Sequence, residues 1–485
     1  MITINFNWIV FIIASATLIG IGAWANHRIK TASAEGSEGF LLGAKQVGVF
    51  VGAGTLMATG YSGWGFIGSP GTAYAFGTIE VFANFLFAPA IVFGTLTFAN
   101  FMRKNAEKSG GLTVPEYLAS SHRGTDREKR KVHFLAGLAT FIFLSVFMIG
   151  QIRAVSLVAS QWLGISELMA SIIFISIIAV FTIQGGLLAV AITDTLMCVG
   201  MLIASIIAIV TIHLHVPLPT LISEVGQMNP EFTNPSSSVP YGNSIYSVFL
   251  VFIYALLFTT TLPYMSVRFL SFKENIKIHN MALLMAPIGI ILSLIPFVGM
   301  FMYHQNPNLA NPDSAMPVFL NTFLSPVTGG LITLFILFAM LSTISSVLQA
   351  LASSLSHDLY LTVVNRNPEH GDIVNRVVVG FTAAWVLFLT FVAPQGLLNQ
   401  IAYIGTGGLI SMFVGPIIMR TIVESNLKTC FASMLTGFIV NVILVLWFDV
   451  GWVEAPILAG LAGCIVYLVM GFMGNEGKRA AKVIE

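Results

Sequence analysis

The feature that most constrains this chain's fold is the repetition of apolar windows about 20 residues long, the length that an α-helix needs to cross a bilayer. Only 9 % of the 485 residues are charged, against roughly 25 % in a soluble domain. Because a backbone inside lipid must satisfy its own hydrogen bonds, such windows predict helices. Thirteen windows occur: 7–26, 46–75, 77–102, 134–162, 165–184, 188–212, 244–267, 281–303, 328–355, 377–394, 397–419, 429–448 and 456–474. The sequence therefore predicts an all-α, polytopic membrane protein with about 13 transmembrane helices.

The basic residues indicate how these helices are oriented. Of the 22 Lys and Arg residues, 21 lie in alternate loops: 27–45, 103–133, 268–280, 356–376, 420–428 and 475–485. Cytoplasmic loops carry the excess of Lys and Arg, so we expect the N-terminus outside and the C-terminus in the cytoplasm, in a cell (plasma or inner) membrane. The basic run 125–133 is then a topology signal rather than a nucleic-acid patch, and no nucleic-acid partner is expected.

The segments outside the membrane are short. The connection 213–243 has no Lys or Arg, and only 475–485 follow the last window. We therefore expect no soluble catalytic or signalling domain, and the function must reside among the helices. The cysteines lie far apart in apolar runs and predict small core residues rather than disulfides or a metal site: Cys198, Cys430 and Cys464.

Charged residues inside the windows are rare, and each is a functional hypothesis because its burial in lipid is costly. Asp194, in GGLLAVAITDTLM, is the only clearly intramembrane acid, whereas Glu80 lies at the outer edge of its window, where we expect water to reach it. Arg153 is the only Lys or Arg residue outside the basic loops. We interpret it as one partner of a structural ion pair or as a helix clamp. Asp194 has Thr193 beside it and no cation close in sequence, which indicates a functional carboxylate that needs an external positive partner.

A second concentration of polar residues lies in the window 328–355. Ala339, Ser342, Thr343 and Ser346 are spaced i, i+3, i+4 and i+7, which is one face of a helix, and Ser345 flanks that face. Hydroxyls and carbonyls there suit a hard cation. The alternative is that a stripe of small residues only lets two membrane helices approach closely.

Two windows carry the signals of broken helices. The stretch ATGYSGWGFIGSPG (58–71) has five glycines and a proline, and FTTTLPYMSVRF (258–269) contains Pro263 in its interior. Irregular backbone at membrane depth is tolerated where it lines a cavity, and its freed carbonyls can coordinate a cation. Paired breaks in two units of opposite topology are typical of secondary transporters.

Four motifs, in order, resemble the sodium:solute symporter family over nearly the whole chain. GGLLAVAITDTL (185–196) is similar to the family signature that begins with GG and ends in a TD pair. MLSTISSVLQALASSLSHDLYL (340–361) resembles its conserved stretch closing in DLY. SGWGFIGSPGTAYAFG resembles the first broken helix, and LPYMSVRFLSFK (262–273) resembles a later segment with an arginine.

The resemblance implies a LeuT-like core of two inverted five-helix repeats with discontinuous helices, one extra helix before the core and two after it. That arrangement agrees with the 13 windows. The implied divisions are an extra helix and cytoplasmic loop (1–45), the first repeat (46–212), an outer loop (213–243), the inverted second repeat (244–419), and two last helices with a short tail (420–485).

The resemblance also implies the coupling ion, Na⁺, and where it binds. The principal sodium site maps to the carbonyls of Ala58, Tyr61 and Ala339 and the hydroxyls of Ser342 and Thr343. A second site, present in some members, maps to Asp194, Ser342, Ser345 and Ser346. The candidate substrate-binding residues are Tyr61, Ser62 and Trp64 on the first broken helix, with Thr260 and Thr261 near the second break.

Departures from the family pattern leave the solute open. Proline-type members carry an acid at the position of Gly60, although they share the SGW tripeptide at 62–64. Pantothenate-type members have histidine where Tyr264 stands and lack Trp64, and many members have glutamine in place of Met197. The candidate solutes are small and carboxylate-bearing: pantothenate, a proline-like amino acid or a monocarboxylate.

The resulting hypothesis is a sodium-coupled importer of a small organic solute that works by alternating access and is not an enzyme. Proton coupling through Asp194 and a transporter-like membrane receptor are the alternatives. A channel would need no coupling site, and an enzyme would need a catalytic constellation that the scattered histidines do not suggest.

Overall fold

The computed structural model of the chain describes residues 2–31, 37–360, 362, 371–393 and 398–473. Within these ranges the protein is helical, with loops and two isolated β-bridges, Val47 to Phe272 and Arg123 to Asn426. The all-α expectation is therefore confirmed.

The helices follow one another with short connections. Those up to residue 232 are α1 (Ile2–Thr31), α2 (Ser37–Leu42), η1 (Gly43–Lys45), α3 (Val49–Gly63), η2 (Trp64–Gly68), α4 (Ser69–Phe76), α5 (Thr78–Ser109), α6 (Val114–Ser120), α7 (Asp126–Leu163), α8 (Glu167–His215), α9 (Leu218–Met228) and η3 (Pro230–Phe232). The later ones are η4 (Ser247–Phe249), α10 (Leu250–Thr261), α11 (Pro263–Ser271), α12 (Ile278–Leu292), α13 (Phe297–Gln305), η5 (Pro312–Ser314), α14 (Ala315–Phe323), α15 (Pro326–Ser353), η6 (Ser354–Tyr360), α17 (Gly371–Val392), α18 (Leu398–Ile418), η8 (Met419–Thr421), α19 (Leu427–Trp447) and α20 (Glu454–Met473).

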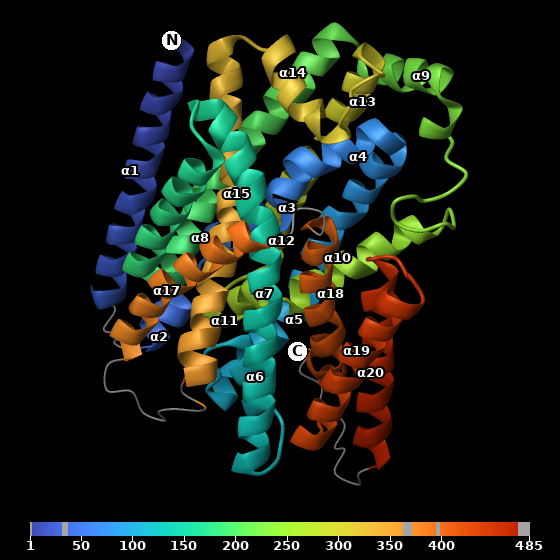
Figure 1. Ribbon diagram of the computed structural model, residues 1–485. Helices are drawn as coiled ribbons and strands as arrows, with labels where there is room; N and C mark the ends of the chain where they lie inside the picture. Colours follow the sequence, from blue (N-terminus) through green and yellow to red (C-terminus); the bar gives the residue numbers. More distant parts are fainter. Residues whose placement is uncertain (1, 32–36, 361, 363–370, 394–397, 474–485) are drawn as a thin grey trace.

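The long helices form one bundle, with α1 at one edge and the α19–α20 pair at the other (Figure 1). Helices α3, α8 and α15 pack against one another in its interior. The short helices α9, α13 and α14 cover one end of the bundle, and α2 and α6 lie toward the other (Figure 1). The interior trio carries most of the polar residues singled out in the sequence.

The number of membrane-spanning helices differs from the expected 13. In the described part of the chain, nine helices are long and apolar enough to cross a membrane, or ten if the bent pair α10–α11 forms one span. Two windows, 165–184 and 188–212, fall in α8, whose 49 residues are interrupted between those windows at Gly186. The window 46–75 is divided among α3, η2 and α4, with 15, 5 and 8 residues. The count of 13 is not confirmed.

The first broken helix is interrupted at a serine. Ser62 has φ 41° and ψ −171°, and a π-helical turn, η2, follows before α4 resumes. A non-glycine residue in this backbone region costs of order 1–3 kcal/mol and persists only where its surroundings hold it. The Ser62 hydroxyl supports the turn by accepting a hydrogen bond from the Trp64 N–H, with an N to Oγ distance of 3.2 Å.

The neighbouring glycines serve close packing instead. Gly60, Gly63 and Gly71 are not among the glycines with positive φ. A Cβ atom at Gly60 would lie 2.7 Å from Ile91 Cδ1, and one at Gly63 would lie 2.6 Å from Met340 Cγ. The backbone therefore turns at Ser62, while these glycines let other helices approach the broken helix.

Two further interruptions shape the interior. Within α8, Gly186 has φ 50°, and a Cβ there would lie 2.3 Å from the carbonyl oxygen of Phe40, so only glycine fits. Helices α10 and α11 meet at an angle of 57°, with Leu262 extended and Pro263 as the first residue of α11. The second predicted break is thus confirmed at Pro263, where the missing N–H removes a helical hydrogen bond.

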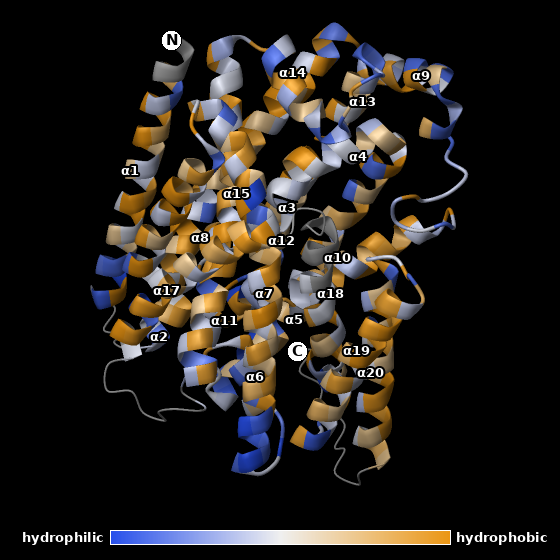
Figure 2. Cartoon of the chain, viewed as in Figure 1, coloured by the Kyte–Doolittle hydropathy of each residue, from blue (hydrophilic) through white to orange (hydrophobic). Residues whose placement is uncertain are grey.

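The distribution of polarity agrees with a membrane bundle. Hydrophilic residues gather at the two ends, including the tip of α7 with its basic run, and hydrophobic residues dominate the helices between them (Figure 2). Cys198, Cys430 and Cys464 are buried and unpaired, as predicted. The basic tail 475–485 and residues 363–370 of the loop 356–376 lie outside the described residues.

Candidate functional site: a cation site beside a cavity

The serine-rich face of α15 is bound to the carbonyls of α3 just before its break. Ser342 Oγ donates to the Ala58 carbonyl oxygen at 3.2 Å and to that of Ala339 at 2.9 Å. Thr343 Oγ1 donates to the carbonyl oxygen of Thr59 at 3.2 Å. All these residues are buried. Two hydroxyls and the α3 carbonyls therefore converge between two helices that are far apart in sequence.

This set of oxygens has the chemistry of a weak alkali-cation site. Carbonyl and hydroxyl oxygens are hard, uncharged ligands, and a hydroxyl that now donates to a carbonyl can turn a lone pair toward an ion. The Tyr61 carbonyl accepts the Trp64 N–H, and the Tyr61 hydroxyl lies 2.6 Å from Oγ of Ser293, the residue that follows α12. Among the predicted ligands, the hydroxyls of Ser342 and Thr343 thus meet the α3 backbone at Ala58 and Thr59, and the role of the Tyr61 carbonyl stays a prediction.

Asp194 has a protein cation as its partner. Arg268 Nη2 lies 2.8 Å from Asp194 Oδ2, and neither side chain is exposed. The expectation that Asp194 lacks a cation partner was wrong because Arg268 was counted with the loop 268–280. Helix α11 continues to Ser271, so Arg268 lies inside the bundle and points back toward α8.

Arg268 makes further contacts through its guanidinium. Its Nε donates to Thr55 Oγ1 at 2.6 Å, and its Nη1 donates to the Tyr264 carbonyl. Its Nη2 shares two hydrogens among Asp194, Thr59 Oγ1 at 2.7 Å and Ser346 Oγ at 2.5 Å. A rigid fork of five donors suits such a buried cluster better than a lysine would. Arg268 therefore connects α11 to α3, α8 and α15.

The two oxygens of Asp194 are not equivalent. Oδ2 accepts from Arg268, Thr55, Thr59 and Ser346. Oδ1 has one long contact, 3.4 Å from Ser345 Oγ, whose hydroxyl also donates to the Ser342 carbonyl at 3.0 Å. The residues of the predicted second sodium site thus lie together, with Arg268 occupying one side of the carboxylate.

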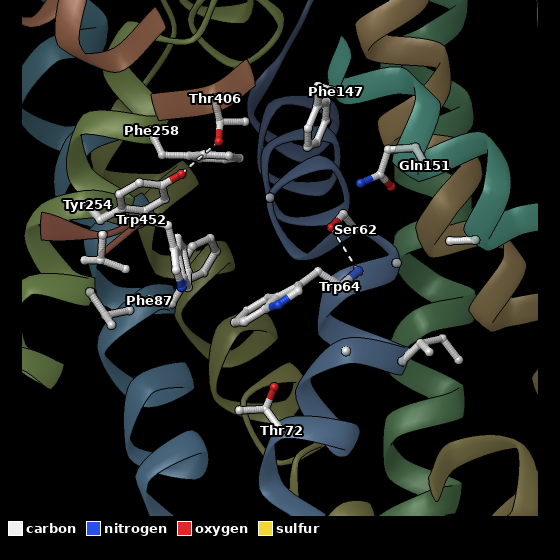
Figure 3. Close-up of a pocket in the computed structure, with 18 of the residues that line it drawn as sticks. Ser62, Trp64, Thr72, Phe87, Phe147, Gln151, Tyr254, Phe258, Thr406 and Trp452 are labelled. Carbon is white, nitrogen blue, oxygen red and sulfur yellow. Dashed lines mark hydrogen bonds between the residues drawn. The ribbon is translucent and has the colours of Figure 1, made fainter. Parts of the chain in front are cut away.

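A cavity of about 300 Å³ opens on the other side of the break, within the size range of small-molecule sites (Figure 3). Aromatic and small residues line most of it: Thr59, Gly60, Ser62, Gly63, Trp64, Ile67, Gly68, Thr72, Phe87, Phe147, Gly150, Gln151, Ala154, Tyr241, Val251, Tyr254, Phe258, Tyr264, Asp313, Thr406, Trp452 and Val453. Ser62 and Trp64 lie between an aromatic group with Phe87 and Phe258 on one side and Gln151 on the other (Figure 3).

The predicted substrate-binding residues divide into two groups. Ser62 and Trp64 line the cavity, whereas Tyr61, Thr260 and Thr261 are not among its lining residues. Thr260 Oγ1 donates to the Leu256 carbonyl at 2.9 Å and Thr261 Oγ1 donates within α10 in the same way. A threonine hydroxyl that donates to its own helix four residues back has its hydrogen satisfied locally, so these two keep only acceptor lone pairs.

Glu80 is not reached by water, contrary to expectation. Its side chain is 0 % exposed, and its Oε1 accepts from Ser69 Oγ at 2.5 Å and Asn84 Nδ2 at 2.8 Å. Its Oε2 accepts from the hydroxyl of Tyr241, which belongs to the connection 213–243. That connection therefore folds back over α5 and seals the acid from solvent.

Arg153 acts as a clamp on the end of α17. Its guanidinium Nη2 donates to the carbonyl oxygens of Thr390 at 2.7 Å and Ala393 at 2.5 Å, and its Nε donates to Thr390 at 3.1 Å. A cation at the last carbonyls of a helix satisfies orphan acceptors and complements the helix dipole. Of the two sequence interpretations, these contacts favour the helix clamp.

Sequence reasoning missed several lining residues of the cavity. Gln151, Tyr254, Thr406, Asp313 and Trp452 come from five different segments of the chain. The one available signal was Gln151, a polar residue two positions before Arg153 in an apolar helix. The others became neighbours only through the packing of distant helices.

Known proteins resemble this chain over most of its length. Sodium/proline symporter 2 of Staphylococcus saprophyticus is 24 % identical over 456 residues, covering 91 % of this chain and 86 % of the relative. The sodium/pantothenate symporter of Haemophilus influenzae is 23 % identical over 411 residues, covering 82 % of each chain.

Among solved structures, a Na⁺-coupled sialic acid symporter superposes with a TM-score of 0.79 at 18 % identity, over 98 % of this chain and 99 % of that one. Mhp1, a nucleobase-cation-symport-1 family transporter, gives a TM-score of 0.53 at 15 % identity, over 91 % of this chain and 93 % of that one. At these identities the likeness shows a common fold. The family match itself extends over residues 40–437, so the chain belongs to the sodium:solute symporter family.

Proposed function

We propose that the protein is a sodium-driven importer of a small organic solute and that its sodium binds where α15 meets the broken helix α3. The observation that carries the proposal is the pair of hydroxyl contacts from Ser342 and Thr343 to the carbonyls of Ala58 and Thr59. They join the two helices at the residues immediately before the break. The cavity lies against the same stretch of chain, because Thr59 and Gly60 before the break and Ser62, Gly63 and Trp64 at and after it all line it.

A bound sodium ion would hold α3 and α15 together. An ion entering from outside replaces the hydroxyl-to-carbonyl hydrogen bonds by coordination and holds α3 against α15, with Ser62 and Trp64 in place for the solute. Loss of the ion to the cytoplasm releases the two helices and favours the inward-facing state, because a ligand shifts a conformational equilibrium only by its differential affinity. One charge crossing about 100 mV contributes about 2.3 kcal/mol to uptake.

The finer architecture belongs to the same proposal. Breaks at Ser62 and Leu262 support two inverted repeats, 46–212 and 244–419, with the outer connection 213–243 between them. The flanking segments are then 1–45 and 420–485, with 13 spans in all. We infer from the basic loops that the N-terminus faces outside and the C-terminus faces the cytoplasm.

Asp194 and Ser345 support a second sodium. The Oδ1 atom of Asp194 has one long hydrogen bond, so a cation can bind there without displacing Arg268 from Oδ2. Proton coupling through Asp194 is the competing proposal, and it predicts uptake driven by an H⁺ gradient with no requirement for Na⁺. The relatives named for proline and pantothenate make a small carboxylate-bearing solute the starting candidate, and we propose no enzymatic or nucleic-acid role.

The test is uptake of radiolabelled proline, pantothenate and short monocarboxylates into proteoliposomes under an inward gradient of Na⁺, K⁺ or H⁺. We expect saturable uptake of one solute only with Na⁺. Uptake driven equally by K⁺ or H⁺ would refute sodium coupling.

The site itself is tested by Ser342→Ala combined with Thr343→Ala, which we expect to abolish sodium activation while the protein stays folded. The matched control is Thr333→Ala with Ser353→Ala on the same helix, because those hydroxyls donate only to carbonyls of α15 itself. Unchanged sodium activation in the first pair would refute the assignment of the ligands.

A further inference from the structure

The cavity next to the broken helix presents aromatic faces and almost no formal charge. Eight aromatic residues line it: Trp64, Phe87, Phe147, Tyr241, Tyr254, Phe258, Tyr264 and Trp452. Among its described lining residues the only charged side chain is the carboxylate of Asp313, on η5, and none is Lys, Arg or His. A solute in this cavity therefore meets π faces and one acid, which is itself solvent-exposed.

The basic residues closest in sequence to the lining residues form hydrogen bonds elsewhere in the protein. Arg153 follows the lining residue Gln151 on α7, but its guanidinium is bound to carbonyls at the end of α17. Arg268 follows Tyr264 on α11, but it is fully buried in the cluster around Asp194. Neither can neutralise a solute anion in the cavity without abandoning these contacts.

Without such a cation, an anionic solute is disfavoured. Moving a carboxylate from water into an apolar cavity is costly unless a charge or several donors compensate it. The helix that restarts after Ser62 offers its amino-terminal dipole, which favours a nearby anion by about two- to fivefold. The Trp64 N–H at that start is already taken by Ser62 Oγ.

Aromatic faces instead attract a cation. The rings form contiguous pairs, with centroids 6.3 Å apart for Trp64 and Phe87, 5.9 Å for Phe87 and Phe258, and 5.5 Å for Tyr254 and Trp452. Gln151 reaches the cavity from the opposite side (Figure 3). The amide oxygen of Gln151 has no hydrogen-bond partner among the described residues.

We infer that the solute of this transporter carries an ammonium group on a compact ring-bearing body and has no net negative charge. Its ring lies among the aromatic faces near Trp64, its ammonium faces those rings and Asp313, and a further polar group bonds Gln151. Cationic amines and zwitterionic amino acids fit this description, whereas pantothenate and free monocarboxylates do not. The inference rests on the proposed function, since it assumes that this cavity holds the transported solute.

The test uses four matched ring compounds that differ in charge: phenethylamine, phenylalanine, phenylacetamide and phenylacetate. Each is titrated into the full-length protein in nanodiscs in NaCl and in KCl, with calorimetry as the readout. We expect the amine and the amino acid to bind at least tenfold more tightly than phenylacetate. Tightest binding of phenylacetate would overturn the inference, and so would equal binding of all four.

Three variants at two positions test the assigned groups. Asp313→Asn is expected to weaken binding of phenethylamine at least threefold and to leave binding of phenylacetamide unchanged. Trp64→Phe is expected to weaken the binding of phenethylamine and of phenylacetamide less than Trp64→Leu does. The matched controls are Glu231→Gln, an exposed acid outside the cavity, and Trp385→Phe on α17, both expected to bind like the parent protein.

If the three cavity variants bind all ligands like the parent, the inference is refuted. A preference for ammonium that is the same in NaCl and KCl would instead refute sodium coupling and support the chemistry of the cavity. The two proposals therefore fail by different observations.

Discussion

Asp194→Asn and Arg268→Gln break the same ion pair, yet we expect them to lower the free energy of unfolding unequally. Both side chains are 0 % exposed, and removing one partner of a buried pair costs about 3–5 kcal/mol because the other charge stays buried. After Asp194→Asn that charge is a guanidinium, which cannot lose its proton in a protein and keeps only neutral oxygens as partners. We expect the full cost of about 3–5 kcal/mol.

Arg268→Gln leaves the Asp194 carboxylate buried without its cation, and this costs less free energy than a buried guanidinium without its anion. After Arg268→Gln the carboxylate keeps its hydrogen bond from Thr55 Oγ1 at 2.7 Å, together with those from Thr59 and Ser346. It can also take up a proton and become neutral, so we expect a loss of about 1–3 kcal/mol. In the double variant neither charge remains, and the coupling energy of the cycle should be at least about 2 kcal/mol.

The assay is the free energy of unfolding of the three variants, measured by denaturant titration in detergent micelles. Arg123→Gln is the control, because its pair with Glu424 is exposed and should contribute at most about 1 kcal/mol. A larger loss for Arg268→Gln than for Asp194→Asn would refute the reasoning. So would a coupling energy near zero, since it would mean that the two charges do not depend on each other.

Two further predictions concern packing and pH. Gly299→Ala places a Cβ 1.9 Å from the Pro70 carbonyl oxygen. We therefore expect it to lower the free energy of unfolding by at least about 2 kcal/mol, measured by thermal or chemical denaturation. In the control, Gly20→Ala, the added Cβ meets no atom within 4 Å, so that variant should be neutral or slightly stabilising. Burial, assisted by nearby Arg420, lowers the pKa of His122 to about 3. As the pH falls, His122 therefore takes up a proton in the unfolded chain before it does so in the folded protein. The free energy of unfolding should then fall by about 2 kcal/mol from pH 7 to pH 5 through this residue. Denaturant titrations at both pH values should show that the free energy of unfolding falls less between pH 7 and pH 5 in His122→Gln than in the parent protein. An equal fall in both proteins would contradict the assignment.

The polar face of α15 could be predicted because its determinants are local, whereas its partner, α3, was implied by the resemblance to the symporter family. The spacing of Ser342 and Thr343 sets one face of a helix, and Pro263 predicts a break because it cannot donate a helical hydrogen bond. Such signals lie within a few residues of each other. The structure therefore agrees with the sequence on which residues of α15 meet α3.

What could not be predicted depends on helices that are distant in sequence. Arg268 looks like the first residue of a basic loop, and only the continuation of α11 carries it to Asp194, 74 positions away. Glu80 looks like an interfacial acid, and only the return of Tyr241 over it removes the water. Periodicity reports which face of a helix is apolar, but it does not report which partner covers that face.

The break at Ser62 is the element that can make binding at one site depend on the other. The carbonyls of Ala58 and Thr59 precede it and face α15, while the side chains of Ser62 and Trp64 line the cavity. A residue held at φ 41° keeps this geometry only while its neighbours hold it. A cation that tightens the contact with α15 therefore stabilises the same turn that shapes the cavity wall. By linkage, a solute resting against that wall must raise the affinity for the cation by the same factor.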